Sequence, residues 1–136
     1  ASGLPMGATL CADWVAEGAG SHGSTFSGNP VVSAAAAATL DVLHEEALAD
    51  RASDVGGYLR AELAAADLPV RDVRGEGLMV GVEVKRGANR VLRDLALDHG
   101  VLALPAGRTV VRLLPPLVVG REQADRVVDA FAEVLG

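Results

Sequence analysis

The sequence predicts an α+β fold in which helices pack on one face of a small, mostly antiparallel sheet. Three observations support this fold class. Segments with the period of a helix alternate with segments in which apolar residues recur at every second position. Proline and glycine mark most of the boundaries between these segments. The 136 residues, 50% of them hydrophobic and 22% charged, suffice for a domain with a buried core.

Residues 1–30 are rich in glycine and serine, and we expect irregular backbone there with one short strand or turn of helix. The character of the chain changes at Pro30. Asn29 is a good N-cap, and Pro30 suits the first position of a helix. The alanine-rich segment Val31–Leu43 is therefore predicted to be a buried helix of about four turns.

A second helix is predicted over Glu46–Ala65, where apolar residues recur at steps of three and four. The pair Gly56-Gly57 weakens this helix by about 1 kcal/mol per glycine, and Leu68-Pro69 ends it. The predicted inward stripe consists of Leu48, Ala52, Val55, Leu59 and Leu63.

Two strands come next. In Leu78–Val84 every second residue is leucine or valine, which is the pattern of a half-buried strand. A shorter strand is expected at Val70–Arg74, and Gly75-Glu76-Gly77 joins the two. A structural turn is the favoured interpretation of these glycines, with a functional role for Arg74 or Glu76 as the alternative.

The remainder of the chain is predicted as helix, two strands and helix. A helix covers Ala88–His99, with Gly100 as its C-cap. The strands are a short one at Val101–Leu104 and a stronger one at Thr109–Leu114. The last element is an amphipathic helix over Arg121–Leu135.

Composition excludes several classes of function. The net charge of -6 argues against binding to nucleic acid or to a membrane surface, because both need basic patches. No uncharged apolar stretch approaches the roughly 18 residues of a membrane span. A single cysteine, Cys11, cannot form an internal disulfide, which fits a cytoplasmic protein. The three histidines have no metal-ligand spacing, so we predict no metal site.

The segment 20–30 is the first candidate for chemistry. Two hydroxyl residues, Ser24 and Thr25, lie among glycines just before a predicted helix start. Glycines allow backbone N–H groups to approach an anion, and the helix N-terminus adds positive potential, so phosphate is the natural ligand. The alternative is a glycine-rich turn with an ordinary N-cap.

Arg112 is the second candidate, because it lies inside the apolar strand segment Val110–Leu114. A guanidinium there must reach a carboxylate, a ligand or solvent, since an unpaired buried charge is costly. Its planar fork suits two-point binding of a carboxylate. The alternatives are an edge-strand arginine that extends to solvent and an internal pair with a glutamate.

These candidates lie in motifs that resemble a known family. The segment His22-Gly23-Ser24-Thr25-Phe26-Ser27-Gly28-Asn29-Pro30 resembles the H-G-S-T-[FY]-G-G-N-P signature of class III (ornithine-type) pyridoxal-phosphate aminotransferases. The similarity continues, in order, through Arg74–Met79 and Val111–Leu117, and it covers essentially the whole chain. Among subgroups, acetylornithine aminotransferase is the most similar.

The resemblance implies a role for each candidate. Thr25, with Ser24, would bind the phosphate of pyridoxal 5'-phosphate across the interface of a homodimer, and Arg112 would receive the substrate carboxylate. Ser27 replaces the usual glycine, a departure that concerns the local backbone geometry and not the role of Thr25. The implied reaction transfers an amino group between N-acetylornithine, or a related omega-amino donor, and 2-oxoglutarate, and arginine biosynthesis is the implied pathway.

The resemblance also implies that this chain is the C-terminal portion of a fold-type I transferase. Residues 1–30 would be the tail of the large cofactor-binding domain, and residues 31–136 the small domain. The family's Schiff-base lysine would precede Ala1, so no catalytic residue is assigned in this chain. Lys85 is the only lysine, and we expect it to be a surface residue. The chain alone is therefore expected to be inactive; the alternative is a non-catalytic binding or oligomerisation module.

Overall fold

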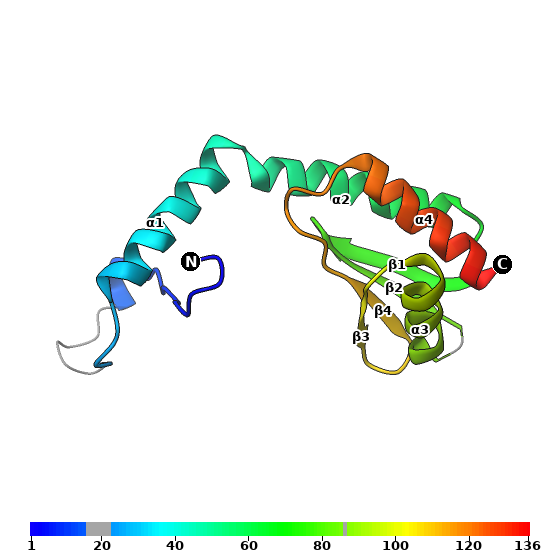
Figure 1. Cartoon of the computed structure of the whole chain (residues 1–136), viewed down its shortest axis with the longest axis horizontal. Helices are drawn as coiled ribbons and strands as arrows, with labels where there is room; N and C mark the ends of the chain where they lie inside the picture. Colours follow the sequence, from blue (N-terminus) through cyan, green and yellow to red (C-terminus); the bar gives the residue numbers. More distant parts are fainter. Residues whose placement is uncertain (16–22, 86) are drawn as a thin grey trace. The chain divides into compact units, whose positions relative to one another are not determined.

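The computed structural model describes residues 1–15, 23–85 and 87–136. The chain divides into two compact units, Ala1–Glu46 and Ala47–Gly136 (Figure 1). Among the described residues, no helix combines the length and the hydropathy that crossing a bilayer requires.

The first unit contains a short 3-10 helix, Asp13–Val15, and the helix α1, Pro30–Glu45. The predicted cap is confirmed, because the backbone N–H groups of Val31 and Val32 donate to Asn29 Oδ1 at 3.0 and 3.4 Å. The predicted burial of this helix is wrong. No residue of α1 is buried, and Leu40 is 64% exposed. The described part of this unit offers only a 3-10 turn and irregular backbone, which cannot enclose a four-turn helix.

The second unit follows the predicted order of elements. They are α2 (Leu48–Ala65), β1 (Val70–Glu76), β2 (Met79–Val84), α3 (Ala88–His99), β3 (Leu104–Ala106), β4 (Val110–Leu113) and α4 (Arg121–Leu135). Gly100 caps α3 in the left-handed conformation, as predicted.

The position of the third strand differs from the prediction. The sequence predicts a strand at Val101–Leu104, whereas β3 begins only at Leu104. The backbone N–H of Val101 donates to the Leu95 carbonyl at 2.9 Å and so closes the end of α3. Val101 and Ala103 then pack against the core. The residues after Gly100 therefore complete the helix end instead of extending the sheet.

The four strands form one antiparallel sheet in the order β1-β2-β4-β3. One face carries the core, and α2, α3 and α4 cover it (Figure 1). The predicted alternation is confirmed, since Val80, Val82 and Val84 are at most 1% exposed. The predicted α2 stripe is confirmed as well, because all five of its residues are buried in this unit. Phe131 of α4 is fully buried in the core.

A close approach between α2 and the β1–β2 hairpin explains one of the helical glycines. A Cβ atom on Gly56 would lie 1.9 Å from the carbonyl oxygen of Gly77, which is in the hairpin turn. One turn further along α2, Arg60 donates a hydrogen bond to the Gly75 carbonyl. Gly56 is therefore required by packing, although the sequence alone suggests only a weakened helix.

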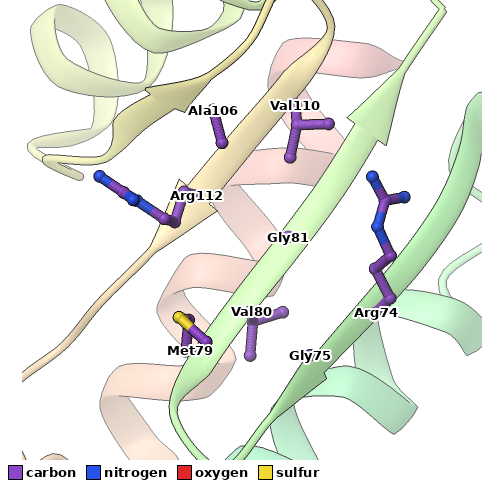
Figure 2. Close-up of a pocket in the computed structure, with 8 residues that line it drawn as sticks. All are labelled: Arg74, Gly75, Met79, Val80, Gly81, Ala106, Val110 and Arg112. Carbon is purple, nitrogen blue, oxygen red and sulfur yellow. The ribbon is translucent and has the colours of Figure 1, made fainter.

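The opposite face of the sheet carries the alternate residues of the strands. Side chains of Arg74, Met79, Val110 and Arg112 project from this face, and the helices of the second unit lie behind the sheet (Figure 2). We call this surface the open face. It presents both arginines that the sequence singled out.

Candidate functional site

Ser24 and Thr25 lie at the surface of the first unit, just before α1. Residues 25–28 form a turn in which the Ser27 N–H donates to the Ser24 carbonyl at 3.3 Å, and Gly28 has a φ of +68°. Within the described ranges, no hydrogen bond engages either hydroxyl. The segment is thus a turn that leads into a capped helix. His22 lies outside the described residues.

Arg112 lies on β4, which is an inner strand between β2 and β3. Arg112 is therefore not on an edge strand, which the alternative required, although its side chain does extend from the open face (Figure 2). Its Nε atom is buried and has no hydrogen-bond partner. Among the described residues of the second unit, no carboxylate lies within salt-bridge distance of its guanidinium. Leaving a buried polar group unsatisfied costs about 1–3 kcal/mol, and more when the group is charged. A group of this kind needs a partner that the described residues do not supply, such as water or an ion.

Arg74 has a different environment, although it lies on the same face. Its guanidinium is 2.8 Å from Asp72 Oδ2 and 2.9 Å from Glu83 Oε2. The hydrogen bond with Asp72, followed by that with Glu83, raises the pKa of Arg74 above its ordinary value. Because two carboxylates already contact it, Arg74 does not need a ligand to balance its charge.

The hairpin glycines have the structural role that the sequence favours. Gly75 has a φ of +153°, and a Cβ there would lie 2.1 Å from the Met79 carbonyl oxygen. Glu76 ends β1 as an exposed residue. The bounds differ from the prediction, because β1 continues through Gly75 and Glu76, which pair with Val80 and Met79. The connection between the two strands is therefore Gly77-Leu78 alone.

A cavity of about 330 Å³ opens on the open face. It lies between Arg74 of β1 and Arg112 of β4, with Gly81 of β2 between them (Figure 2). Strand pairing places these three residues in one row, since Gly81 is the partner of both Arg74 and Arg112. Sequence reasoning identified both arginines and missed Gly81. The alternation in β2 places Gly81 on the face of the strand that is turned away from the core. That Gly81 lies between two arginines follows from the strand order alone.

The predicted site residues belong to two different units. Ser24 and Thr25 are in the first, and Arg112 is in the second. Lys85 is exposed in a bend directly after β2. It lines a separate cavity of about 360 Å³ with Arg90 and Asp94, and this cavity shares no residue with the one beside Arg112.

Comparisons with known proteins agree with the motifs. The family model of class III aminotransferases matches residues 1–135. The LysW-aminoadipate semialdehyde transaminase of Deinococcus radiodurans is 44% identical over 99% of this chain and 32% of its own length. The acetylornithine aminotransferase of Methanosarcina mazei is 41% identical over 96% of this chain and 33% of its own length. The chain thus spans about a third of the length of these relatives.

Solved structures have the same fold. The ornithine aminotransferase of Toxoplasma gondii matches with a TM-score of 0.78 and 34% identity, over 88% of this chain and 30% of that chain. The acetylornithine aminotransferase of Elizabethkingia anophelis matches with a TM-score of 0.76 and 35% identity, over 85% of this chain and 31% of that chain. The α+β fold predicted from the sequence is therefore a segment of the fold of pyridoxal-phosphate-dependent aminotransferases. The chain belongs to the class III aminotransferase family.

Proposed function

We propose that this chain is the C-terminal segment of an aminotransferase that exchanges an amino group between N-acetylornithine, or a related omega-amino donor, and 2-oxoglutarate. The observation that carries this proposal is the buried, unpartnered Nε of Arg112 beside an open cavity. Relatives named acetylornithine and ornithine aminotransferase support the donor class and a role in arginine biosynthesis. A cytoplasmic location is part of the same proposal.

The domain assignment is also a proposal. Residues 1–30 would be the tail of the large domain, and residues 31–136 would be the small domain. The compact units divide at a different residue, after Glu46, so that α1 is grouped with the residues before it.

The residues before α1 fit the phosphate of pyridoxal 5'-phosphate. The hydroxyls of Ser24 and Thr25 are exposed and engage in no hydrogen bond among the described residues, and the positive end of the α1 dipole follows them. Ser24 and Thr25 would hold the phosphate of the cofactor in the neighbouring subunit of a homodimer. When bound, the cofactor supplies an electron sink for amino-group transfer.

Arg112 would bind and orient the amino-acid or 2-oxo-acid substrate through its carboxylate. A guanidinium binds a carboxylate through two parallel N–H···O hydrogen bonds, which fixes both position and direction. Because the second unit's described carboxylates leave this guanidinium unpaired, the site is ready for an anion without first breaking an internal ion pair. Orientation of a bound substrate is itself a large contribution to catalysis.

Replacing Thr25 with valine tests the phosphate site. In the full-length aminotransferase, we expect Thr25→Val to weaken binding of pyridoxal 5'-phosphate by about 10- to 100-fold, because a hydrogen bond to a charged group is lost. Titration of the apoenzyme with the cofactor, followed by absorbance, measures the Kd. Thr39→Val is the matched control, since the Thr39 hydroxyl donates to the Ala35 carbonyl within α1. Equal Kd values for all three proteins would refute the role of Thr25 and favour a non-catalytic module.

The proposed inactivity of the chain by itself is tested at Lys85. We expect residues 1–136, mixed with pyridoxal 5'-phosphate and then reduced with borohydride, to carry no stoichiometric label on Lys85, because this exposed lysine lies in a cavity separate from that of Arg112. Mass spectrometry of the reduced chain measures the label, with Lys85→Arg as the control. Stoichiometric labelling of Lys85, together with transamination that Lys85→Arg abolishes, would overturn the proposal.

A further inference from the structure

The floor of the cavity between Arg74 and Arg112 is a glycine. Figure 2 shows the Arg112 side chain extending toward β3, and the Arg74 side chain on the opposite side of β2. Only Gly81 lies between them on β2, and Met79 and Val110 border the space. We call this space the Gly81 trough.

Any side chain at position 81 would enter the Gly81 trough. A Cβ atom there would lie 3.3 Å from Val110 Cγ1, a tight contact that a small shift of the valine relieves. Side chains of a strand stand roughly perpendicular to the sheet. A longer side chain would therefore rise from the floor into the cavity. The volume of the trough depends on the absence of a side chain at this position.

The two ends of the Gly81 trough differ in charge. At one end, Arg74 is balanced by Asp72 and Glu83, which contact it at 2.8 and 2.9 Å. At the other end, Arg112 has an unpartnered Nε. Between the two ends the neighbouring side chains are the apolar Met79 and Val110. This distribution suits a ligand with one carboxylate, followed by an aliphatic chain.

We propose that Gly81 is a specificity-determining residue, which leaves room for the aliphatic chain of a ligand whose single carboxylate is bound by Arg112. The inference rests on the proposed function, because it takes Arg112 as the carboxylate-binding residue. It adds that Arg74 takes no part in binding a second carboxylate. A dicarboxylate would have to place its other end outside the Gly81 trough.

The test uses pentanoate as the probe and the chain of residues 1–136 labelled with ¹⁵N. We expect pentanoate to shift the amide signals of Gly81, Val110 and Arg112, and pentanamide, which has no charge, to leave them unchanged. Gly81→Leu should weaken pentanoate binding by about tenfold or more because it fills the trough, whereas Gly81→Ala should change it by less than about threefold. Leu97→Phe adds bulk to an exposed position of α3, outside the cavity lining, and should leave the affinity unchanged.

Several results would overturn the inference. One is that pentanoate shifts the amide signals of residues away from Gly81 and leaves that of Gly81 unchanged. This measurement uses the unaltered chain, so it does not depend on whether Gly81→Leu folds. Another is unchanged affinity in a folded Gly81→Leu chain. A third is glutarate binding about tenfold more tightly than pentanoate, which would show that Arg74 binds a second carboxylate.

These measurements are separate from the test of the proposed function. Amino-group transfer is measured on the full-length enzyme with its cofactor, whereas pentanoate binding is measured on this chain without it. If the full-length enzyme is inactive but pentanoate shifts the Gly81 amide signal, the proposed reaction is refuted and the proposed binding site at Gly81 stands. An active enzyme without those shifts would refute the role of Gly81 alone.

Discussion

Replacing Arg112 with lysine in the full-length aminotransferase is expected to lower kcat/KM by about 100-fold for carboxylate substrates, and Arg112→Ala by about 1000-fold. The lysine retains the charge but lacks the planar fork that binds both oxygens of a carboxylate. Most of the loss should appear as a higher KM, because the guanidinium binds the substrate carboxylate in the ground state as well as in the transition state. Steady-state kinetics with the amino donor and with 2-oxoglutarate measure the change.

A second measurement separates a binding role from a structural one. Because Arg112 Nε is buried and unpartnered, Arg112→Leu in this chain should leave the free energy of unfolding unchanged or raise it by about 1 kcal/mol. A structural arginine would instead destabilise the fold when it is removed. The control Arg93→Lys alters an exposed arginine on α3 that is paired with Asp94, and it should change neither kinetics nor stability. A stable enzyme with normal KM after Arg112→Ala would disprove the binding role.

The elements that the sequence predicted best are those with strong local signals. The helix α3 and the helix α4 begin and end at the predicted residues, since glycine or the period of apolar residues marks each boundary. The β2 strand was predicted from strict alternation, and its inward residues are buried. In each of these segments the local preference and the tertiary packing agree.

The predictions that failed depend on what lies next to a segment in space. The composition of Val31–Leu43 suits a buried helix, but burial requires a neighbour, and none of α1 is buried in this structure. The third strand was placed too early because apolar residues after Gly100 pack against the core without pairing. A pattern of apolar residues predicts that a segment is buried without showing which element covers it.

In the candidate site, too, the features that sequence reasoning missed depend on which segments are neighbours in space. Ser24, Thr25 and Arg112 could be identified from motifs and from their residue types. The role of Gly81 depends on the strand order β1-β2-β4-β3, which places it between Arg74 and Arg112. No local pattern specifies this order, because the pairing of β2 with β4 joins segments that are distant in the sequence.

The pair Gly56 and Gly57 provides the sharpest test of the packing beneath the site. We expect Gly56→Ala to lower the free energy of unfolding of this chain by about 3 kcal/mol, because the new methyl group would lie 1.9 Å from the Gly77 carbonyl oxygen. Gly57→Ala should raise it by about 0.5–1 kcal/mol, since no atom lies within 4 Å of the added Cβ and alanine favours a helix. Chemical denaturation, followed by the helical signal, measures both changes.

Two adjacent glycines in one helix thus have opposite expected effects, and helix propensity alone predicts the same gain for both. If Gly56→Ala were as stable as Gly57→Ala, α2 would not approach the hairpin turn as closely as the structure indicates. The consequence extends to the open face, because the hairpin that Gly56 contacts includes β2 and its Gly81. A shift of the hairpin away from α2 would move Gly81 relative to Arg112 on β4. Gly56→Ala should therefore weaken pentanoate binding even under conditions in which the chain remains folded.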